Sequence, residues 1–144
     1  YIISRNINLL PTSNKVYIMN GFFYKILTWA NDRNIIKGST AQQQYPKLLE
    51  ENIELFATLH PEKSADEIKD SVINIIYDLL EKGKIKQAPA GKTIADDVGD
   101  NMVVLAIMAR QEGLTVTECL EHAYNDIKDR SGQLIDGVFV KEES

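Results

Sequence analysis

Residues 95–109 read ADDVGDNMVVLAIMA, a run in which apolar residues occupy nearly every side of a helix. Thr93 precedes this run in a position to cap a helix, and Gly113 follows it as a typical residue just past a helix end. The pattern predicts a helix from Thr93 to about Glu112. Because a helix that is apolar on all sides is normally a buried one, we expect this helix to be buried.

Apolar residues recur at helical spacing in four further segments, each followed by a Gly or a Pro. Two of these segments begin with capping-box spacing, Ser64 with Glu67 and Thr115 with Glu118. Pro46 is expected either to kink its helix or to mark its first turn. No strand signal of useful length accompanies these patterns, so the sequence predicts an all-α fold, a bundle of about four to five helices. The first segment begins at residue 22 and has Gly38 just past its end; the others run from residue 40 to 59 before Pro61, from 64 up to Gly83 and from 115 up to Gly132.

The length of the chain, 144 residues, is typical of one domain. Its 21 acidic and 16 basic residues give a net charge of −5, which argues against DNA or RNA binding because nucleic acids select basic surfaces. No apolar run reaches the roughly 18 residues of a membrane span, and a single cysteine, Cys119, fits a reducing compartment. We therefore expect a cytoplasmic protein without a membrane or nucleic-acid partner. Residues 1–18 show no helical period and are expected to be a loosely attached extension of a domain that covers residues 19–144.

Two groups of carboxylates share one spacing. Glu51 and Glu54 lie three residues apart, about one helical turn, with Glu50 beside them, and Asp97 and Asp100 repeat that spacing. Taken alone, the glutamates fit a solvated helix face, and the aspartates fit an exposed first turn, where the helix dipole favours anions. On two helices packed face to face, however, the four paired carboxylates would repel one another unless a cation bound between them.

A site made only of carboxylate oxygens suits a hard ion such as Mg²⁺ or Mn²⁺, and Mg²⁺ commonly binds substrate phosphates as well. This chemistry indicates phosphoryl transfer or phosphoanhydride hydrolysis. Lys128 and Arg130 are candidate ligands for phosphate oxygens, although cations near a helix end also favour the helix dipole. Asn125 is a further candidate because it lies in mid-helix without a capping role. His60 and His122 match no metal-ligand spacing.

The two acidic motifs, Glu50-Glu51-x-x-Glu54 and Asp97-x-Gly99-Asp100, resemble the E-E-x-x-E … E-x-x-D signature of the MazG-like nucleotide pyrophosphohydrolases. These are all-α enzymes of the dimeric-dUTPase-like superfamily. The resemblance covers most of residues 22–142, with two departures: Asp97 stands where the family has Glu, and segment 61–92 is longer than the usual connection. The stretches that carry it are WANDRNIIKGST (29–40), QYPKLLEENIEL (44–55), GDNMVVLAIMA (99–109) and AYNDIKDRSGQLIDGVFVKE (123–142).

The resemblance implies a Mg²⁺-dependent enzyme that hydrolyses nucleoside triphosphates to the monophosphate and pyrophosphate. Glu51, Glu54, Asp97 and Asp100 match the metal-ligand positions of the family. Glu50 matches the leading Glu of the motif, a carboxylate that either orients the attacking water or supports the metal ligands without binding the metal itself. Because the Asp97 arm is shorter than that of Glu, we expect Mn²⁺ to substitute for Mg²⁺.

The resemblance also places cations and an aromatic residue at the substrate. Lys47, Lys128 and Arg130 are expected near the triphosphate, with Asn125 as a further substrate contact, and Trp29 either packs near the base or belongs to the core. A homodimer or homotetramer is expected, since family members assemble in this way and several helices carry an apolar excess. Two alternatives stay open: a non-catalytic helical interaction module, and a related all-α hydrolase that acts on another nucleotide phosphoanhydride.

Overall fold

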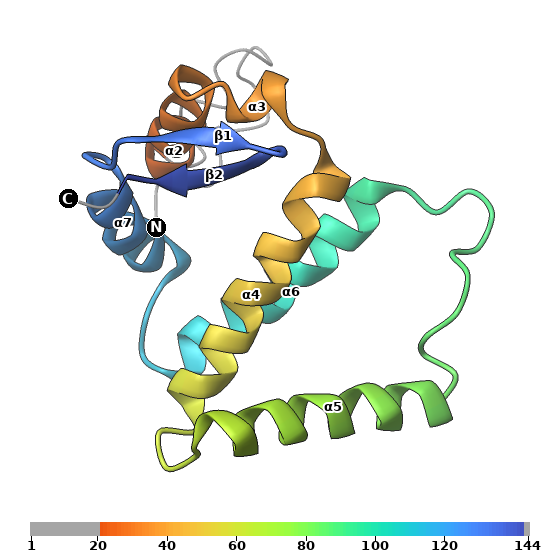
Figure 1. Cartoon of the computed structure of the whole chain (residues 1–144). Helices are drawn as coiled ribbons and strands as arrows, with labels where there is room; N and C mark the ends of the chain where they lie inside the picture. Colours follow the sequence, from red (N-terminus) through yellow and green to blue (C-terminus); the bar gives the residue numbers. More distant parts are fainter. Residues whose placement is uncertain (1–20, 143–144) are drawn as a thin grey trace, which may run out of the picture. The chain divides into compact units, whose positions relative to one another are not determined.

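The computed structural model describes residues 21–142, which are mostly helical (Figure 1). The contacts within the chain divide it into two units, each described by itself below: in the described range, unit 1 holds residues 21–40 and 97–142, and unit 2 holds residues 41–96. The predicted extension, residues 1–18, lies outside the described residues. The elements of unit 1 are α2 (Gly21–Asp32), α3 (Ile35–Gly38), α7 (Val116–Ile127), β1 (Gly132–Ile135) and β2 (Val138–Lys141), and those of unit 2 are α4 (Ala41–Leu59) and α5 (Ala65–Glu81).

Helix α6 (Ile94–Gln111) is the helix predicted from residues 95–109; its first residues belong to unit 2 and the rest to unit 1. It ends just before Gly113, whose φ of 76° lies in the left-handed region that glycine adopts without strain. The expectation that this helix is buried is wrong for the chain by itself, because α6 contains no buried residue. Val98, Val103 and Val104 are 53%, 59% and 56% exposed. The apolar surface of α6 is therefore open to a partner.

Both predicted capping boxes are confirmed. At the start of α5, the Ser64 backbone N–H donates to the Glu67 carboxylate and the Glu67 backbone N–H donates to the Ser64 hydroxyl oxygen. Thr115 and Glu118 form the same reciprocal pair at the start of α7. Each box provides hydrogen-bond acceptors for two backbone N–H groups at the helix start, which would otherwise bond to water.

Two boundaries differ from the expectation. Pro46 lies well inside α4, which begins at Ala41, so the interpretation that Pro46 marks the first turn is wrong. Helix α7 ends at Ile127 rather than near residue 132, and the chain continues into two strands. The fold is therefore mostly helical with a small sheet rather than purely α.

The sheet is an antiparallel hairpin of β1 and β2 in which Ile135 pairs with Val138 and Leu134 with Phe139. Asp136 and Gly137 form its two-residue turn, with φ values of 49° and 80°. Positive φ at both turn residues defines the turn whose twist matches that of the flanking strands, and an Asp-Gly pair favours it. The hairpin is thus encoded locally by its turn.

Unit 1 packs its hairpin and α7 against α2 (Figure 1). The Trp29 ring of α2 meets the Phe139 ring of β2 edge to face, with ring centroids 5.2 Å apart, and Ala30 is 8% exposed. Gly38 at the end of α3 allows β1 to approach, because a Cβ at this position would lie 2.8 Å from the Leu134 side chain. The Ser39 hydroxyl donates to the Gly137 carbonyl and fixes the hairpin turn to the end of α3.

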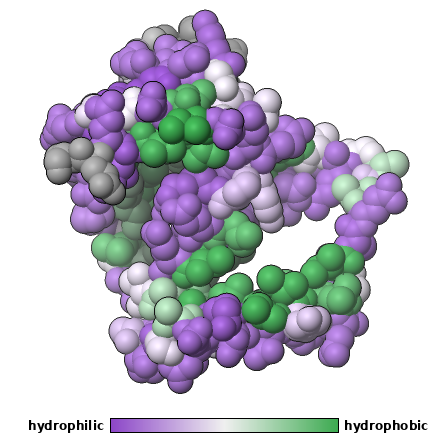
Figure 2. All heavy atoms as spheres, viewed as in Figure 1, coloured by the Kyte–Doolittle hydropathy of each residue, from purple (hydrophilic) through white to green (hydrophobic). Residues whose placement is uncertain are grey.

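Unit 2 consists of α4 and α5, which contact each other but contain no buried residue. On α5, Ile73, Ile76, Tyr77 and Leu80 are 42–62% exposed although they are spaced as one helical face. Figure 2 shows hydrophobic side chains in a row along this helix. Among the described helices, none has both the length and the apolarity needed to cross a membrane.

Candidate functional site

The first acidic group lies on α4, where all three glutamates are exposed. Lys47 lies one turn before them, and its Nζ is 2.7 Å from Glu50 Oε1 and 2.8 Å from Glu51 Oε1. The hydrogen bond to Glu50, followed by that to Glu51, raises the pKa of Lys47 above its ordinary value. The ammonium group of Lys47 thus occupies a position between two carboxylates that would otherwise repel each other.

Glu54 lies on the next turn of α4 and completes this group. Among the ion pairs of the described residues, none includes the Glu54 carboxylate. Its backbone carbonyl accepts a hydrogen bond from the Thr58 hydroxyl at 3.0 Å, which is a contact within the helix. The glutamate group therefore presents carboxylate oxygens to solvent, with one internal cation beside them.

The second acidic group lies in the first turns of α6. Asp96 has a structural role there, since its Oδ2 accepts hydrogen bonds from the Thr93 backbone N–H at 3.0 Å and from the Thr93 hydroxyl at 2.9 Å. The backbone N–H of Thr93, followed by its hydroxyl, lowers the pKa of Asp96. Asp97 and Asp100 are exposed, and the Asp97 backbone carbonyl accepts from the Asn101 amide at 2.8 Å. Asp96 thus caps the helix, whereas Asp97 and Asp100 are the two acids predicted from the sequence as metal ligands.

The two groups belong to different units, the glutamates to unit 2 and Asp97 with Asp100 to unit 1. Across residues 21–142, no three His, Cys, Asp or Glu side chains gather closely enough to hold a metal ion. The meeting of the two acidic pairs at one cation therefore stays a prediction. Their donor set fits Mg²⁺ or Mn²⁺, because it consists of exposed carboxylate oxygens.

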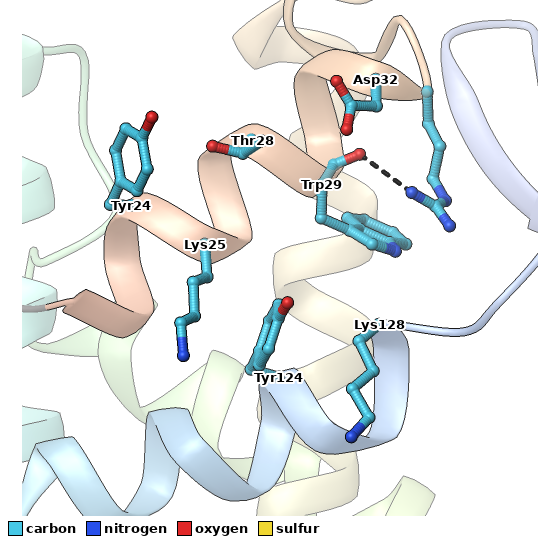
Figure 3. A pocket seen from close by; sticks show the side chains of 8 residues that line it. Tyr24, Lys25, Thr28, Trp29, Asp32, Tyr124 and Lys128 are labelled. Carbon is cyan, nitrogen blue, oxygen red and sulfur yellow. Dashed lines mark hydrogen bonds between the residues drawn. The ribbon is translucent and has the colours of Figure 1, made fainter.

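A pocket of about 210 Å³ lies within unit 1, between α2 and α7 (Figure 3). Pockets for drug-sized ligands measure roughly 300–1,000 Å³, so this one has room for part of a ligand, such as one phosphate group with its neighbour. The residues that line it are aromatic, hydroxyl-bearing or charged: Tyr24, Lys25, Thr28, Trp29, Asp32, Arg33, Tyr124 and Lys128.

Two of the predicted substrate residues, Trp29 and Lys128, line this pocket together. Arg130 and Asn125 are not among its lining residues. The Arg130 side chain donates to the Asp126 carbonyl at 3.2 Å, and the Arg130 carbonyl accepts two hydrogen bonds from the Arg33 guanidinium at 2.6 and 3.0 Å. Arg130 thus helps to join the end of α7 to α2.

Trp29 has a packing role whatever else it does. Its ring contacts Phe139, and the Arg33 guanidinium lies 4.6 Å from its centroid while donating to the Trp29 carbonyl at 3.3 Å. The buried indole N–H has no acceptor among the described residues. The alternative that assigns Trp29 to the core is therefore supported by contacts, and one part of its surface still faces the pocket.

Lys25, Thr28 and Asp32 line the pocket but were not predicted from the sequence. A signal existed, because positions 25, 28, 29 and 32 follow the i, i+3, i+4, i+7 spacing of one helix face. Tyr124 of α7 was missed as well, although it lies one turn before Lys128, the C-cap residue of that helix. Comparisons of the chain with protein-family models, with curated proteins and with solved structures give no match. The resemblance to the MazG-like family thus stays a prediction.

Proposed function

We propose that the protein is a Mg²⁺-dependent nucleoside triphosphate pyrophosphohydrolase, which releases the nucleoside monophosphate and pyrophosphate. The observation that carries this proposal is the repeated carboxylate pair, Glu51 with Glu54 and Asp97 with Asp100, exposed on two helices. Exposed acids one turn apart repel each other, and a divalent cation bound between them relieves that repulsion. Lys47 already neutralises part of the charge on Glu50 and Glu51, so a bound Mg²⁺ would compete with its ammonium group for the Glu51 carboxylate.

In the proposed reaction, a water oxygen forms a bond to the α-phosphorus, and the bond from that phosphorus to the α,β-bridging oxygen breaks. Pyrophosphate leaves with the electron pair of the broken bond. Glu50 orients the water and accepts its proton, which requires the Lys47 ammonium to move from Glu50 toward the phosphate oxygens. Glu51, Glu54, Asp97 and Asp100 would bind Mg²⁺, which when bound neutralises charge on the phosphates.

The proposal is tested by incubating the protein with a panel of NTPs and dNTPs in Mg²⁺ and measuring pyrophosphate and orthophosphate separately. We expect pyrophosphate, and E51Q and D100N are each expected to lower its release by about 100-fold or more, since a lost metal ligand removes several kcal/mol of charge stabilisation. D70N on α5 is the matched control and is expected to retain activity. Release of orthophosphate alone would support a different phosphoanhydride hydrolase.

Thermal melts separate a metal site from a merely acidic surface. Without metal, E51Q and D100N are expected to melt at or above the temperature of the parent, because each removes a charge from a crowded anionic group. Mg²⁺ is expected to raise the melting temperature of the parent, since it binds only the native arrangement of the carboxylates. A parent melt that ignores Mg²⁺, with both variants less stable, would contradict the metal site.

Asp97 is the position at which the chain departs from the family pattern. We propose that Mn²⁺ supports activity at least as well as Mg²⁺, because Mg²⁺ demands stricter geometry than the short Asp arm provides. D97E is expected to shift the preference toward Mg²⁺, and D97A to abolish activity. Unchanged metal dependence in D97A would assign Asp97 to the helix start alone.

We also propose that two or more copies assemble through the exposed apolar face of α5, residues 73, 76, 77 and 80. The proposal rests on unit 2 itself, because two helices without a buried residue have no core of their own. The same face favours the second candidate function, a non-catalytic interaction module. Light scattering after size exclusion decides the oligomeric state, and the pyrophosphate assay decides between enzyme and module.

A further inference from the structure

The pocket of unit 1 concentrates positive charge in an acidic protein. Lys25, Arg33 and Lys128 line it beside a single acid, Asp32, whereas the whole chain has a net charge of −5. A local excess of cations against an acidic background attracts small anions to that place. The pocket is therefore suited to an anion rather than to a cationic or purely apolar ligand.

The two lysines are the cations available to such an anion. Arg33 is engaged, because its guanidinium donates to the carbonyls of Arg130 and Trp29. Lys25 and Lys128, in contrast, form no ion pair within the described part of the chain. An unpaired ammonium group beside a concave surface retains its full capacity to bind phosphate oxygens.

Lys25 lies beside two aromatic rings. Its Nζ lies 4.9 Å from the Phe22 centroid and 5.5 Å from the Tyr124 centroid, both within the range of cation–π attraction. Figure 3 shows Lys25 reaching from α2 toward α7 on one side of the Tyr124 ring, with Lys128 on the other side. The two ammonium groups thus flank one ring, and each comes from a different helix.

Hydroxyl groups supply neutral donors between these cations. Thr28 and Tyr124 line the pocket, and their hydroxyls bond to no other residue in the range 21–142. Figure 3 shows the Tyr124 hydroxyl directed toward α2, on the side where Thr28 lies. Phosphate oxygens accept hydrogen bonds from hydroxyls and ammonium groups alike, so the lining matches two linked phosphates better than an apolar base.

We propose that this pocket binds the β- and γ-phosphates of the nucleoside triphosphate, the part that leaves as pyrophosphate, through Lys25, Lys128, Thr28 and Tyr124. This assignment rests on the proposed function for the identity of the ligand. It adds Lys25 as a substrate-binding residue, and it makes the α2–α7 pocket the place where the product is released.

Trp29 provides a direct measurement, because it lines the pocket and is the one tryptophan of the sequence. Sodium pyrophosphate is titrated into the protein in EDTA, which removes any contribution of a metal at the carboxylates. We expect a saturable change in tryptophan fluorescence that sodium chloride at equal ionic strength does not produce. The absence of a saturable change, confirmed by calorimetry, would overturn the proposal.

The variants K25M and K128M keep the aliphatic stems and remove the charges. Each is expected to weaken pyrophosphate binding by about tenfold, since a hydrogen bond to a charged group is lost. K37M is the matched control, because Lys37 is an exposed lysine of α3 outside the pocket. Circular dichroism verifies that the variants fold. Equal affinities in K25M, K128M and the parent would contradict the proposal.

Two further ligands separate the phosphates from the base, and the hydrolysis assay separates this proposal from the function. A nucleoside triphosphate with a methylene bridge between the α- and β-phosphorus is expected to bind with the same dependence on Lys25, and a nucleoside monophosphate to bind more weakly. A monophosphate that binds as tightly as pyrophosphate would overturn the assignment. Pyrophosphate binding that depends on Lys25 without NTP hydrolysis would contradict the function alone, whereas hydrolysis with an unchanged KM in K25M would contradict the pocket alone.

Discussion

Units 1 and 2 differ in how far along the chain their interactions reach. In unit 1, Arg33 donates to the carbonyl of a residue 97 positions away, and Ser39 to one 98 positions away. In unit 2, the ion pairs of Lys47, Lys69 and Lys82 join residues no more than four apart. The side-chain hydrogen bonds of unit 1 thus join distant parts of the chain, whereas the ion pairs of unit 2 join neighbouring residues only.

The difference shows where the stability of unit 2 must come from. Ion pairs within a helix contribute about 0.2–0.5 kcal/mol each, whereas ordering the backbone costs about 1–2 kcal/mol per residue. Local pairs on α4 and α5 are thus far too weak to hold the two helices in place. The exposed apolar residues of α4 and α5 are a further source of stabilisation, provided that a partner covers them.

The largest effect is expected from a charge on the apolar face of α5. I76D places a carboxylate where we expect a second copy to bind, and it is expected to abolish assembly and to lower the helix content of unit 2. N74D adds the same charge to an exposed polar position of the same helix and is the control. Light scattering and circular dichroism measure both effects. An assembled I76D protein would show that unit 2 does not use this face.

A smaller effect is expected from the contact that joins α2 to the end of α7. R33M removes the hydrogen bonds to the Arg130 and Trp29 carbonyls and the contact over the Trp29 ring. We expect a loss of about 1–3 kcal/mol in the free energy of unfolding of unit 1. Urea unfolding followed by Trp29 fluorescence measures this loss, with K37M as the control. If R33M lowered the free energy of unfolding by less than K37M does, the aromatic contacts alone would hold α2 in place.

The two capping boxes provide the same change in both units. S64A and T115A each remove one N-cap hydroxyl and are expected to cost about 1 kcal/mol. Because the contacts of unit 2 are local, S64A is expected to speed amide hydrogen exchange along the whole of α5, and T115A only in the first turn of α7. Mass spectrometry of the exchanged peptides distinguishes these results. If exchange became faster over an equal part of α5 and α7, the two units would not differ in how local their contacts are.

The smallest effect concerns two glutamates. The Ser64 backbone N–H is the main cause that lowers the pKa of Glu67, whereas the Thr115 hydroxyl is the main cause that lowers the pKa of Glu118. A carboxyl with a lowered folded-state pKa stabilises the fold above its ordinary pKa of 4.5, and this contribution disappears as the pH falls through the folded-state value.

T115A is therefore expected to return the pKa of Glu118 further toward 4.5 than S64A returns that of Glu67. Carboxyl ¹³C titration by NMR measures both groups in the parent and the variants. The opposite order would mean that backbone and hydroxyl donors act alike at both helix starts.

The helices could be predicted because their signals are local. Capping residues and apolar spacing gave the starts of α5, α6 and α7, and Gly113 gave the end of α6. The hairpin was missed because its strands have four residues each, too short for a clear alternating pattern. Its Asp136-Gly137 turn was visible in the sequence, and the turn was the better signal.

The candidate site was predictable only in part, for a physical reason. Carboxylates at one-turn spacing can be found from the sequence because both members lie on one helix. In the pocket, Lys25 of α2 lies next to Tyr124 of α7. These residues are 99 positions apart, so no local sequence pattern predicts their contact. The expectation that α6 is buried was wrong for the same reason. Apolar spacing indicates which face of a helix is apolar, but it does not indicate which part of the chain or which partner packs against that face.

The insertion of unit 2 between the two parts of unit 1 also sets an order of events during synthesis. The carbonyl of Arg130 emerges from the ribosome after Arg33 by 97 residues, about 5–20 s at typical elongation rates of 5–20 residues per second. During this interval α4 and α5 are complete, while α2 has neither α7 nor the hairpin beside it. We therefore expect the nascent chain to expose the apolar surfaces of both units at once, and unit 1 to close late in folding, when its last strand becomes available.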